Sequence, residues 1–368
     1  MLNKSVLCWC GCYGRCSFEP IWAVLAWSFQ ALLTGRFPKR DHEGHVFKDP
    51  WRRAMAGKRL PVAAACLAKC GDWSWFKQAL NLCGWRGETA DKHMCWLCGA
   101  GFNCKMNCYD ARINANWRSS MVSNAEYLLH SMNQNKYVCG IWSIPGFVLR
   151  YCRPDWMHCC DLGITQDVSG NCMYELLQEL GGSQSNGQKQ CSQLMNMIAV
   201  ASKELRVDKP FNKLTVGMVV RAGKPKLRLK AAETRHFIPV LMFMLNHFFK
   251  NDSDHSRLRL QCVAALSNCY RELDNWVQSE SQISLARFAR QHVMLYSELS
   301  KAATDAKKWQ LYPKHHLFLH VCEQARVCPK AEWNYSDEDE IGTAVKFGKG
   351  AHVAHLCTSL LAKHRDCF

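Results

Sequence analysis

No apolar run in this sequence is long enough to cross a membrane. The longest one, Ile21 to Leu33, contains Ser28 and Gln30 and is shorter than the roughly 20 residues of a membrane-spanning helix. A secretory signal peptide is not evident either, since Arg15, Glu19 and several cysteines interrupt the region before this run. We therefore expect an intracellular protein that makes no membrane contact.

Acidic residues are scarce, and residues 1–18 contain none at all. The 368-residue chain has 47 Lys and Arg against 31 Asp and Glu, which gives a formal net charge of +16. Such an excess favours a polyanionic partner such as nucleic acid. Hydrophobic residues make up 48% of the chain, as is typical of a folded globular protein, and the length suffices for two or three domains.

Cysteine, by contrast, is abundant, with 23 residues. Proteins held together by many disulfides are usually short secreted chains that lack a large apolar core. This chain is long and rich in apolar residues, so we expect a reducing compartment in which most cysteines are small buried side chains.

The hydrophobic pattern predicts a mostly α protein with a small α/β part. The apolar segment Pro61–Cys70 is short, as a buried strand would be, although periodicity alone leaves a helix open. Helices are expected on both sides of it, over Glu19–Gly35 and Trp73–Leu82. The helices expected later span Asn124–Asn133, Leu162–Leu180, Gln188–Leu205, Lys230–Phe249, Ser256–Gln278 and Ile283–Ala306, with two more between Pro313 and Leu361 around a polar break at Asn334–Asp339.

Cys95 and Cys98 form a Cys-x-x-Cys pair, which can present two thiolates to one zinc ion. A structural zinc site takes four ligands, so a second pair is needed. The nearest candidates are Cys104 and Cys108, and the others are His93 and His158. The alternative is that these cysteines are reduced thiols that only pack in the core.

His316 and His320 also have the spacing of zinc ligands on a helix. A zinc protease of the H-E-x-x-H type needs a Glu at position 317, where this chain has Leu317. We therefore expect both histidines on a helix surface.

Four further residues are candidates for a catalytic or metal-binding role. Asp72 follows the apolar segment, Asp155 and His158 form an Asp-x-x-His motif, and Glu338 lies in an acidic run that opens a helix. Each has a structural alternative, because an Asp before a helix is commonly an N-cap and acids favour the positive end of the helix dipole. Asp155 with His158 can equally be a capping aspartate and a core histidine, and Asp161 is a weaker candidate.

In order along the chain, the segments Gly71-Asp72-Trp73, Cys95-x-x-Cys98, Asp155-x-x-His158 and Tyr335-x-x-Glu338-x-x-x-Gly342 resemble the catalytic region of cut-and-paste DNA transposases, specifically the CACTA (En/Spm-like) and Plavaka-like group. The resemblance implies a protein derived from a transposable element, DNA recombination chemistry and a place in the nucleus. It also implies a ribonuclease-H-like sheet whose carboxylates hold two Mg²⁺ ions for DNA strand cleavage and transfer. Asp72 and Glu338 would be catalytic, supported by Asp155 and His158.

The first catalytic aspartate of that pattern has no counterpart, since Glu19 and Asp41 lie at a helix start and in a charged connector. We therefore expect an N-terminally truncated and inactive DDE-type transposase remnant, with an incomplete ribonuclease-H-like core interrupted by a Cys-rich segment and a large helical insertion. The expected domains are 1–82 with Asp72, 83–120 as the zinc segment, 121–310 as the helical insertion, and 311–368 with Glu338.

The segment around Pro225 alternates basic and other residues, and its cations could face successive DNA phosphates. These cations are Lys224, Lys226, Arg228 and Lys230. A solvated basic turn is the alternative. No complete DNA-reading motif stands out, so we expect DNA binding through charge, and an oligomer is compatible with it. A non-enzymatic helical zinc-binding module that holds nucleic acid or protein is the rival function, and a decayed reading frame is the third.

Overall fold

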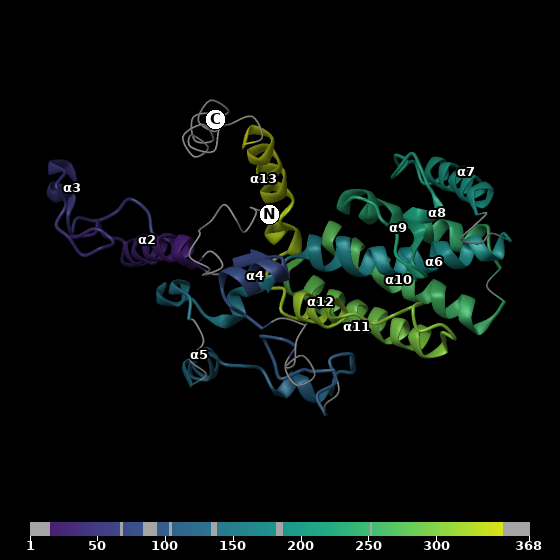
Figure 1. Cartoon of the computed structure of the whole chain (residues 1–368), viewed down its shortest axis with the longest axis horizontal. Helices are drawn as coiled ribbons and strands as arrows, with labels where there is room; N and C mark the ends of the chain where they lie inside the picture. The colour runs from purple at the N-terminus through teal and green to yellow at the C-terminus, as the bar shows by residue number, and fades with distance from the viewer. Residues whose placement is uncertain are drawn as a thin grey trace.

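The computed structural model describes residues 15–66, 69–83, 94–102, 105–133, 138–181, 187–250 and 252–348. Helices dominate these ranges (Figure 1). The longer ones are α2 (Arg15–Thr34), α5 (Asn124–Asn133), α6 (Thr165–Glu179), α7 (Gln188–Glu204), α9 (Ala231–His247), α10 (Asp254–Asp274), α11 (Gln278–Ala302), α12 (Pro313–Glu323) and α13 (Tyr335–Gly348). The short ones are α3 (Pro50–Met55), α4 (Trp73–Ala79), α8 (Val216–Val219), the 3₁₀ turns η1 (Asn116–Ser119), η2 (Gly140–Ser143), η3 (Leu149–Tyr151) and η5 (Pro329–Glu332), and the π-helical turn η4 (Met157–Ile164).

Two small sheets complete the described part. Strand β1 (Lys69–Gly71) runs parallel to β2 (Cys152–Pro154), with Gly71 opposite Pro154. Strands β3 (Val220–Arg221) and β4 (Lys224–Pro225) form an antiparallel hairpin. The expectation of a mostly helical protein with a small α/β part is confirmed, whereas the ribonuclease-H-like core stays a prediction, because the described strands form only these two pairs.

The prediction of a strand over Pro61–Cys70 is largely wrong. Among its described residues, only Lys69 and Cys70 pair with another strand, and residues 61–66 have no regular structure. Val62 is 60% exposed, and the alanines that follow it offer little apolar surface for a partner to cover. An uninterrupted apolar run therefore did not mean burial.

The helix predictions came closer to the structure. Asn124–Asn133 is a helix with the expected bounds, and α6 begins later than expected because the π-helical turn precedes it. The break expected at Asn334–Asp339 was wrong, since α13 begins at Tyr335. The carbonyl of Asn334 accepts a hydrogen bond from the Glu338 N–H at 3.0 Å, and acids in the first turn favour the positive helix end.

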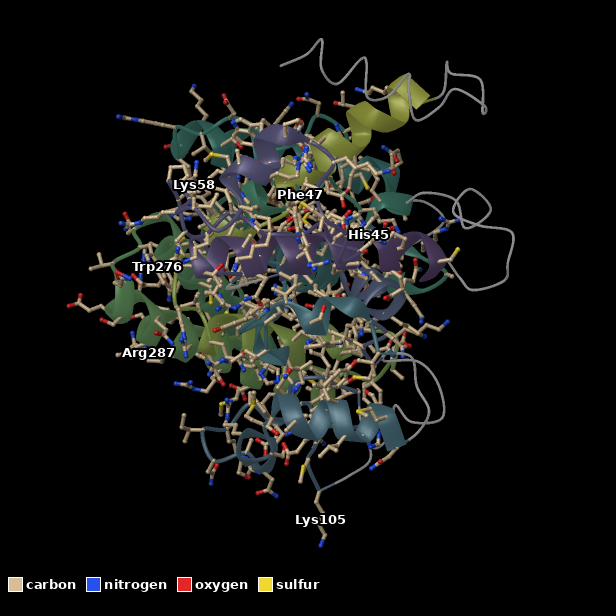
Figure 2. All side chains as sticks on the ribbon, turned by 90° about the vertical axis from the view of Figure 1, so that its left-hand side faces the viewer. His45, Phe47, Lys58, Lys105, Trp276 and Arg287 are labelled. Carbon is tan, nitrogen blue, oxygen red and sulfur yellow. The ribbon has the colours of Figure 1, made fainter. Side chains whose placement is uncertain are left out.

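Helices α6 and α9 to α12 form the main body, while α2 and α3 extend to one side and α13 rises from it (Figure 1). The core of this body contains fully buried side chains such as Phe237, Tyr296 and Phe318. At the extended end, Phe47 packs against Trp27 of α2 with ring centroids 6.4 Å apart, on the side that faces the viewer in Figure 2. Helix α12 packs against α11, η4 and β2, so it lies where the helical body meets the parallel strands.

Most of the described cysteines are buried, as the sequence indicated. Burial raises the pKa of thiols such as Cys262 and Cys269 well above the ordinary value, which keeps them protonated and unreactive. In the part of the chain that the structure describes, none of the helices combines the length and apolarity of a membrane span.

Candidate metal centre and acidic site

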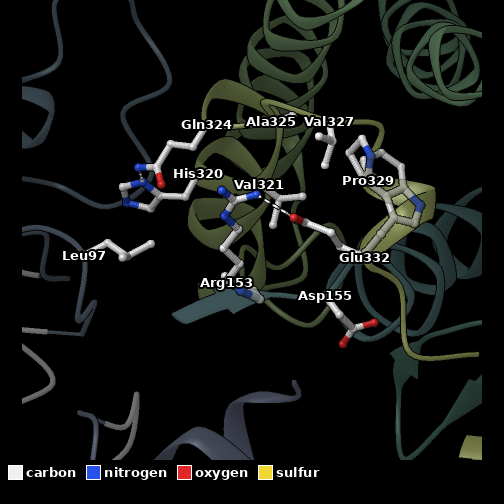
Figure 3. Close-up of a pocket in the computed structure, with 12 residues that line it drawn as sticks. Leu97, Arg153, Asp155, His320, Val321, Gln324, Ala325, Val327, Pro329 and Glu332 are labelled. Atoms are coloured by element: carbon white, nitrogen blue, oxygen red, sulfur yellow. Dashed lines mark hydrogen bonds and ion pairs between the residues drawn. The ribbon is translucent and has the colours of Figure 1, made fainter. Parts of the chain in front are cut away.

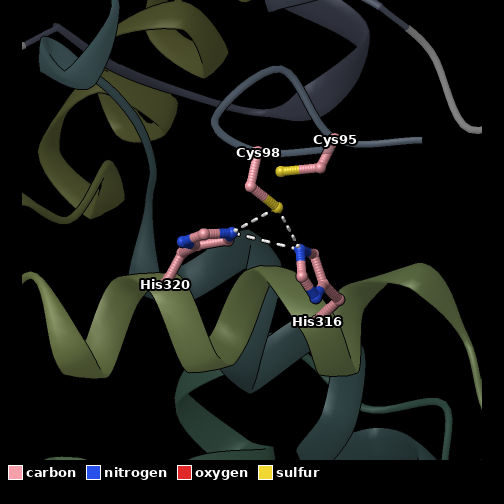
Figure 4. A group of neighbouring side chains, drawn as sticks. All are labelled: Cys95, Cys98, His316 and His320. Carbon is pink, nitrogen blue, oxygen red and sulfur yellow. Dashed lines mark hydrogen bonds between the residues drawn. The ribbon is translucent and has the colours of Figure 1, made fainter. Parts of the chain in front are cut away.

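Four buried side chains converge between a cysteine loop and α12 (Figure 4). They are Cys95, Cys98, His316 and His320, and their ligand atoms all lie within 4.8 Å of one another. The Sγ atom of Cys98 is 3.2 Å from Nε2 of His316 and 3.4 Å from Nε2 of His320. The two Nε2 atoms are 3.1 Å apart. Two sulfurs and two imidazole nitrogens at such spacing could hold a metal ion with tetrahedral geometry.

Local structure explains why both histidines point at the cysteines. Helix α12 starts at Pro313, which suits the first helical position, and residues four apart on a helix share a face. The cysteine loop is closed on itself by hydrogen bonds such as Met94 N–H to the Ala100 carbonyl at 2.9 Å, which holds Cys95 and Cys98 toward that face. The Trp117 ring packs edge-on against His316 and His320 and helps to exclude water from the group.

The outer ring nitrogens also have partners. Nδ1 of His316 lies 3.0 Å from the Cys108 carbonyl, and by donating to it leaves Nε2 available as a ligand. Nδ1 of His320 lies 3.0 Å from the side-chain amide of Gln324. The two atoms of an amide group are assigned from such networks, and the oxygen of Gln324 facing the ring would accept the Nδ1–H.

The protonation states also suit a metal ligand set. Burial raises the pKa of a thiol, but at Cys95 the hydrogen bond from Cys98 and the nearby His316 and His320 outweigh it and lower the pKa well below its ordinary value. Burial lowers the pKa of His316, so its imidazole is neutral. The group thus offers a thiolate and a neutral imidazole, the forms that bind metals.

Cys95 and Cys98 do face a common centre, as expected, but the two side chains that complete the group, His316 and His320, differ from the expected ones. Cys108 contributes its carbonyl oxygen to His316 and is outside the cluster, while His158 is bonded elsewhere. Cys104 and His93 lie outside the described residues.

The expectation that His316 and His320 lie on a helix surface was wrong, since they are 0% and 2% exposed. The reason is that α12 is covered on both sides, by the helical body and by the cysteine loop. The signal in the sequence was the apolar run Leu317 to Leu319 between the histidines, which marks a helix buried on most of its faces.

A second group of side chains lies at the ends of β1 and β2. Asp72 directly follows β1 and Asp155 directly follows β2. Because the two strands are parallel neighbours, both aspartates lie at the same edge of the sheet. The Asp72 carboxylate also accepts a hydrogen bond from the Trp75 N–H at 2.5 Å, so it caps α4 as the structural alternative anticipated.

His158 connects Asp155 to Glu338. Its Nδ1 is 2.7 Å from Oδ2 of Asp155, and its Nε2 is 3.4 Å from Oε1 of Glu338. The Asp155 side chain is fully buried, whereas that of Glu338 is half-exposed. Burial lowers the pKa of His158, but Asp155, followed by the charges of Asp72 and Glu338, outweighs burial and raises it. The structure thus brings together the four residues that the resemblance selected, with the His158 ring between the carboxylates of Asp155 and Glu338.

Helix α12 also reaches this acidic site. Asp72, Asp155 and His158 line a pocket together with Lys314, whose Nζ donates a hydrogen bond to the His158 carbonyl at 2.6 Å. Burial lowers the pKa of Lys314.

A further pocket lies between the Cys/His group and the acidic site. Figure 3 shows His320 and Asp155 on its two sides, with the ion pair between Arg153 and Glu332, 2.8 Å long, in the middle. The Cys/His group and the acidic group are therefore neighbours, and helix α12 contributes to both.

The basic segment is only partly as expected. It is not helical, and Lys224, Arg228 and Lys230 are at least partly exposed. Lys226 instead turns inward, with its Nζ 3.3 Å from the Asp167 carboxylate and 3.3 Å from the Leu162 carbonyl. The intervening Leu227 and Leu229 are buried, which fixes the segment against the helical body.

Comparison with known proteins identified no relative: no family model matches the chain, and neither the curated proteins nor the solved structures contain a significant match.

Proposed function

We propose that this chain is a transposon-derived DNA-binding protein, the remnant of a DDE-type transposase of the CACTA or Plavaka-like group. The observation that carries the proposal is the meeting of Asp72 and Asp155 at one sheet edge, with Glu338 joined to Asp155 through His158. Asp72 and Glu338 are far apart in the sequence, and the resemblance selects both as members of one site.

The chemistry of such a site depends on carboxylates that hold Mg²⁺, which would polarise a phosphodiester and activate water or a 3′-hydroxyl. In this chain Asp72, Asp155 and Glu338 supply the negative charge. His158 pairs with two of these acids, and its raised pKa favours the protonated ring, which competes with a divalent cation for them. We therefore propose DNA binding without efficient strand cleavage or transfer.

We further propose that the metal at Cys95, Cys98, His316 and His320 is zinc. Two thiolates and two imidazoles are a common zinc ligand set, and a site closed by four protein ligands is structural because no position stays open for a substrate. Its role would be to fasten the cysteine loop to α12, which lies beside the acidic site.

DNA binding and strand cleavage by the purified chain test this function, with Asp72→Asn as the matched control. Asn is also a good N-cap, so this variant keeps the cap of α4 and removes only the charge. We expect wild type and variant to bind labelled duplex DNA with similar affinity and to yield no cleavage product with Mg²⁺ or Mn²⁺. Absence of DNA binding at low salt would contradict the proposal, and cleavage that depends on Asp72 would make the chain an active enzyme.

The second candidate is a non-enzymatic zinc-binding module that holds a protein. The observation in its favour is that the Cys/His group has a complete ligand set, whereas the acidic site is partly neutralised by His158. Stoichiometric zinc in a chain that binds no DNA would select this candidate.

A further inference from the structure

The β3–β4 hairpin carries positive charges that face each other. Arg221 of β3 lies directly opposite Lys224 of β4 in the antiparallel register. Like charges in directly opposed cross-strand positions repel and destabilise the pair. The hairpin therefore retains an unfavourable arrangement that a bound anion would relieve.

The turn of this hairpin contains one strained residue, Ala222. Ala222 and Gly223 connect the strands with φ angles of 52° and 77°, both in the left-handed region. Glycine tolerates that region, but alanine is strained there because of its Cβ atom. A third cation lies at this turn, since Nζ of Lys307 is 3.5 Å from the Ala222 carbonyl. Strain that persists in a folded protein is commonly found at functional sites.

A shallow cleft next to the hairpin adds further cations. Lys213, Arg228 and Lys230 line it, and Glu233 is the one acidic residue among its described lining residues. The Glu233 carboxylate already accepts a hydrogen bond from the Lys230 N–H at 2.9 Å and caps α9. Arg228 donates to the carbonyls of Gly217 and Lys226, so its guanidinium is held in place by neutral acceptors.

Among the described residues, no carboxylate forms an ion pair with the cations of the hairpin and the cleft. Burial and the neighbouring Arg221 lower the pKa of Arg228, although a guanidinium keeps its charge at any physiological pH. Within the described ranges, the ion pairs include none of Lys213, Arg221, Lys224, Arg228 and Lys230. Lys226, one residue away from Pro225, provides the contrast because it pairs with Asp167.

We propose that the β3–β4 hairpin and the adjoining cleft bind the phosphodiester backbone of a nucleic acid, with Arg221, Lys224 and Arg228 as the central contacts. The inference rests on the proposed DNA binding and gives it a location. Successive phosphates of the backbone would lie between cations that now repel one another, and release of counterions would drive the binding. Free inorganic phosphate offers the same phosphate oxygens and is the alternative ligand of this site.

The test measures the affinity of the full-length chain for a fluorescently labelled DNA duplex by anisotropy across a series of NaCl concentrations. The test variant is Arg221→Ala/Lys224→Ala/Arg228→Ala. The control variant, Lys48→Ala/Arg53→Ala/Lys58→Ala, removes the same charge from exposed residues around α3, at the other end of the molecule (Figure 1). Thermal unfolding of both variants verifies that they fold.

We expect the test variant to bind at least tenfold more weakly near about 0.1 M salt, and the slope of log K against log salt to decrease by roughly 2–3, since each lost phosphate contact removes about 0.9. The control should stay within about twofold of wild type. Arg221→Lys/Arg228→Lys, which keeps the charges, should retain most of the affinity, which would show that the loss in the alanine variant comes from the missing charges.

Equal weakening in the two alanine variants, or no weakening in the test variant, would overturn this location and leave DNA binding itself standing. A wild-type chain that binds no DNA would overturn both proposals. Inorganic phosphate at constant ionic strength distinguishes the two ligand sources. If it displaces the duplex at low millimolar concentration, the site holds a single phosphate group and the backbone proposal fails.

Discussion

Tyr335 donates a hydrogen bond to the buried carboxylate of Asp161, with 2.7 Å between Oη and Oδ2. This contact fastens the first turn of α13 to the π-helical turn, while the rest of α13 rises from the body (Figure 1). The Arg235 guanidinium lies over the rings of Trp333 and Tyr335 and supports the same contact. Glu338 follows one turn later, so the position of Tyr335 determines whether Glu338 reaches His158.

Replacement of Tyr335 by Phe should therefore lower the pKa of His158. Loss of the bond to Asp161 frees α13, and Glu338 then contributes less to the raised His158 pKa. The measurement is an NMR titration of the His158 ring. Glu338→Gln gives the limit for complete loss of the Glu338 charge, and Tyr174→Phe removes a hydroxyl elsewhere as the control. A His158 pKa that is unchanged in Tyr335→Phe but lowered in Glu338→Gln would show that α13 is held by other contacts.

Asp161 itself should make stability depend on pH. Burial raises its pKa from 3.8 to about 6, despite hydrogen bonds from Tyr270 and Tyr335 that lower it. Between these two values the folded state binds a proton that the unfolded state has lost. The contribution of Asp161 to the free energy of unfolding is thus fully present below about pH 4. It falls by about 2–3 kcal/mol as the pH rises through 6.

Urea unfolding at several pH values measures this dependence. Asp161→Asn cannot titrate, so its stability should lack that fall between about pH 4 and pH 6, and the difference between the two proteins should change across this window. Parallel curves for wild type and Asp161→Asn would contradict the assignment. Asp254→Asn, which changes a carboxyl that is 99% exposed in the first turn of α10, serves as the control for general charge effects.

The metal centre predicts roughly one zinc ion per chain when the thiols are kept reduced, because four ligands make one closed site. Cys98→Ser should lose most of this zinc. Cys322→Ser is the control, because it changes an equally buried thiol on α12 that is outside the Cys/His group, and it should keep the zinc. Elemental analysis of the purified proteins gives the ratio. Zinc that is absent from wild type, or retained fully by Cys98→Ser, would identify these side chains as packing residues only.

Gly170 permits α6 to approach the basic segment. A Cβ atom at this position would lie 2.3 Å from Cα of Lys226 and 2.5 Å from N of Leu227, which are backbone atoms that cannot rotate away. Gly170→Ala should therefore destabilise the fold by about 3 kcal/mol or more, the upper end for overpacking. Gly217→Ala is the control, since nothing lies within 4 Å of its added Cβ. Urea unfolding measures both, and equal stabilities would contradict the close approach.

Local patterns in the sequence predicted local structure well. Asn124–Asn133 and the extent of α7 followed from helical periodicity, which depends on neighbours within two turns. The strand prediction for Pro61–Cys70 failed because the burial of a strand depends on a partner that packs against it. Apolar character alone does not provide that partner.

The candidate site shows the same difference between local features, which the sequence predicted, and long-range contacts, which it did not. Cys98 and His316 are 218 positions apart, and no spacing rule relates residues at that distance. The spacing of the histidines was visible, but their burial depends on the loop that packs over them. The adjacency of Asp72 and Asp155 requires the parallel pairing of two short strands, which the sequence indicated only through the order of motifs in a resembling family.

The wide separation of the two ligand pairs has a topological consequence. An ion bound by Cys98 and His316 joins points 218 positions apart, so the chain between them becomes a closed ring that contains α6 to α11. Closing so long a ring restricts the unfolded chain far more than the folded one. A single cut of the backbone inside the ring would leave the two fragments of the folded protein joined through the ion, and a chelator would remove that link.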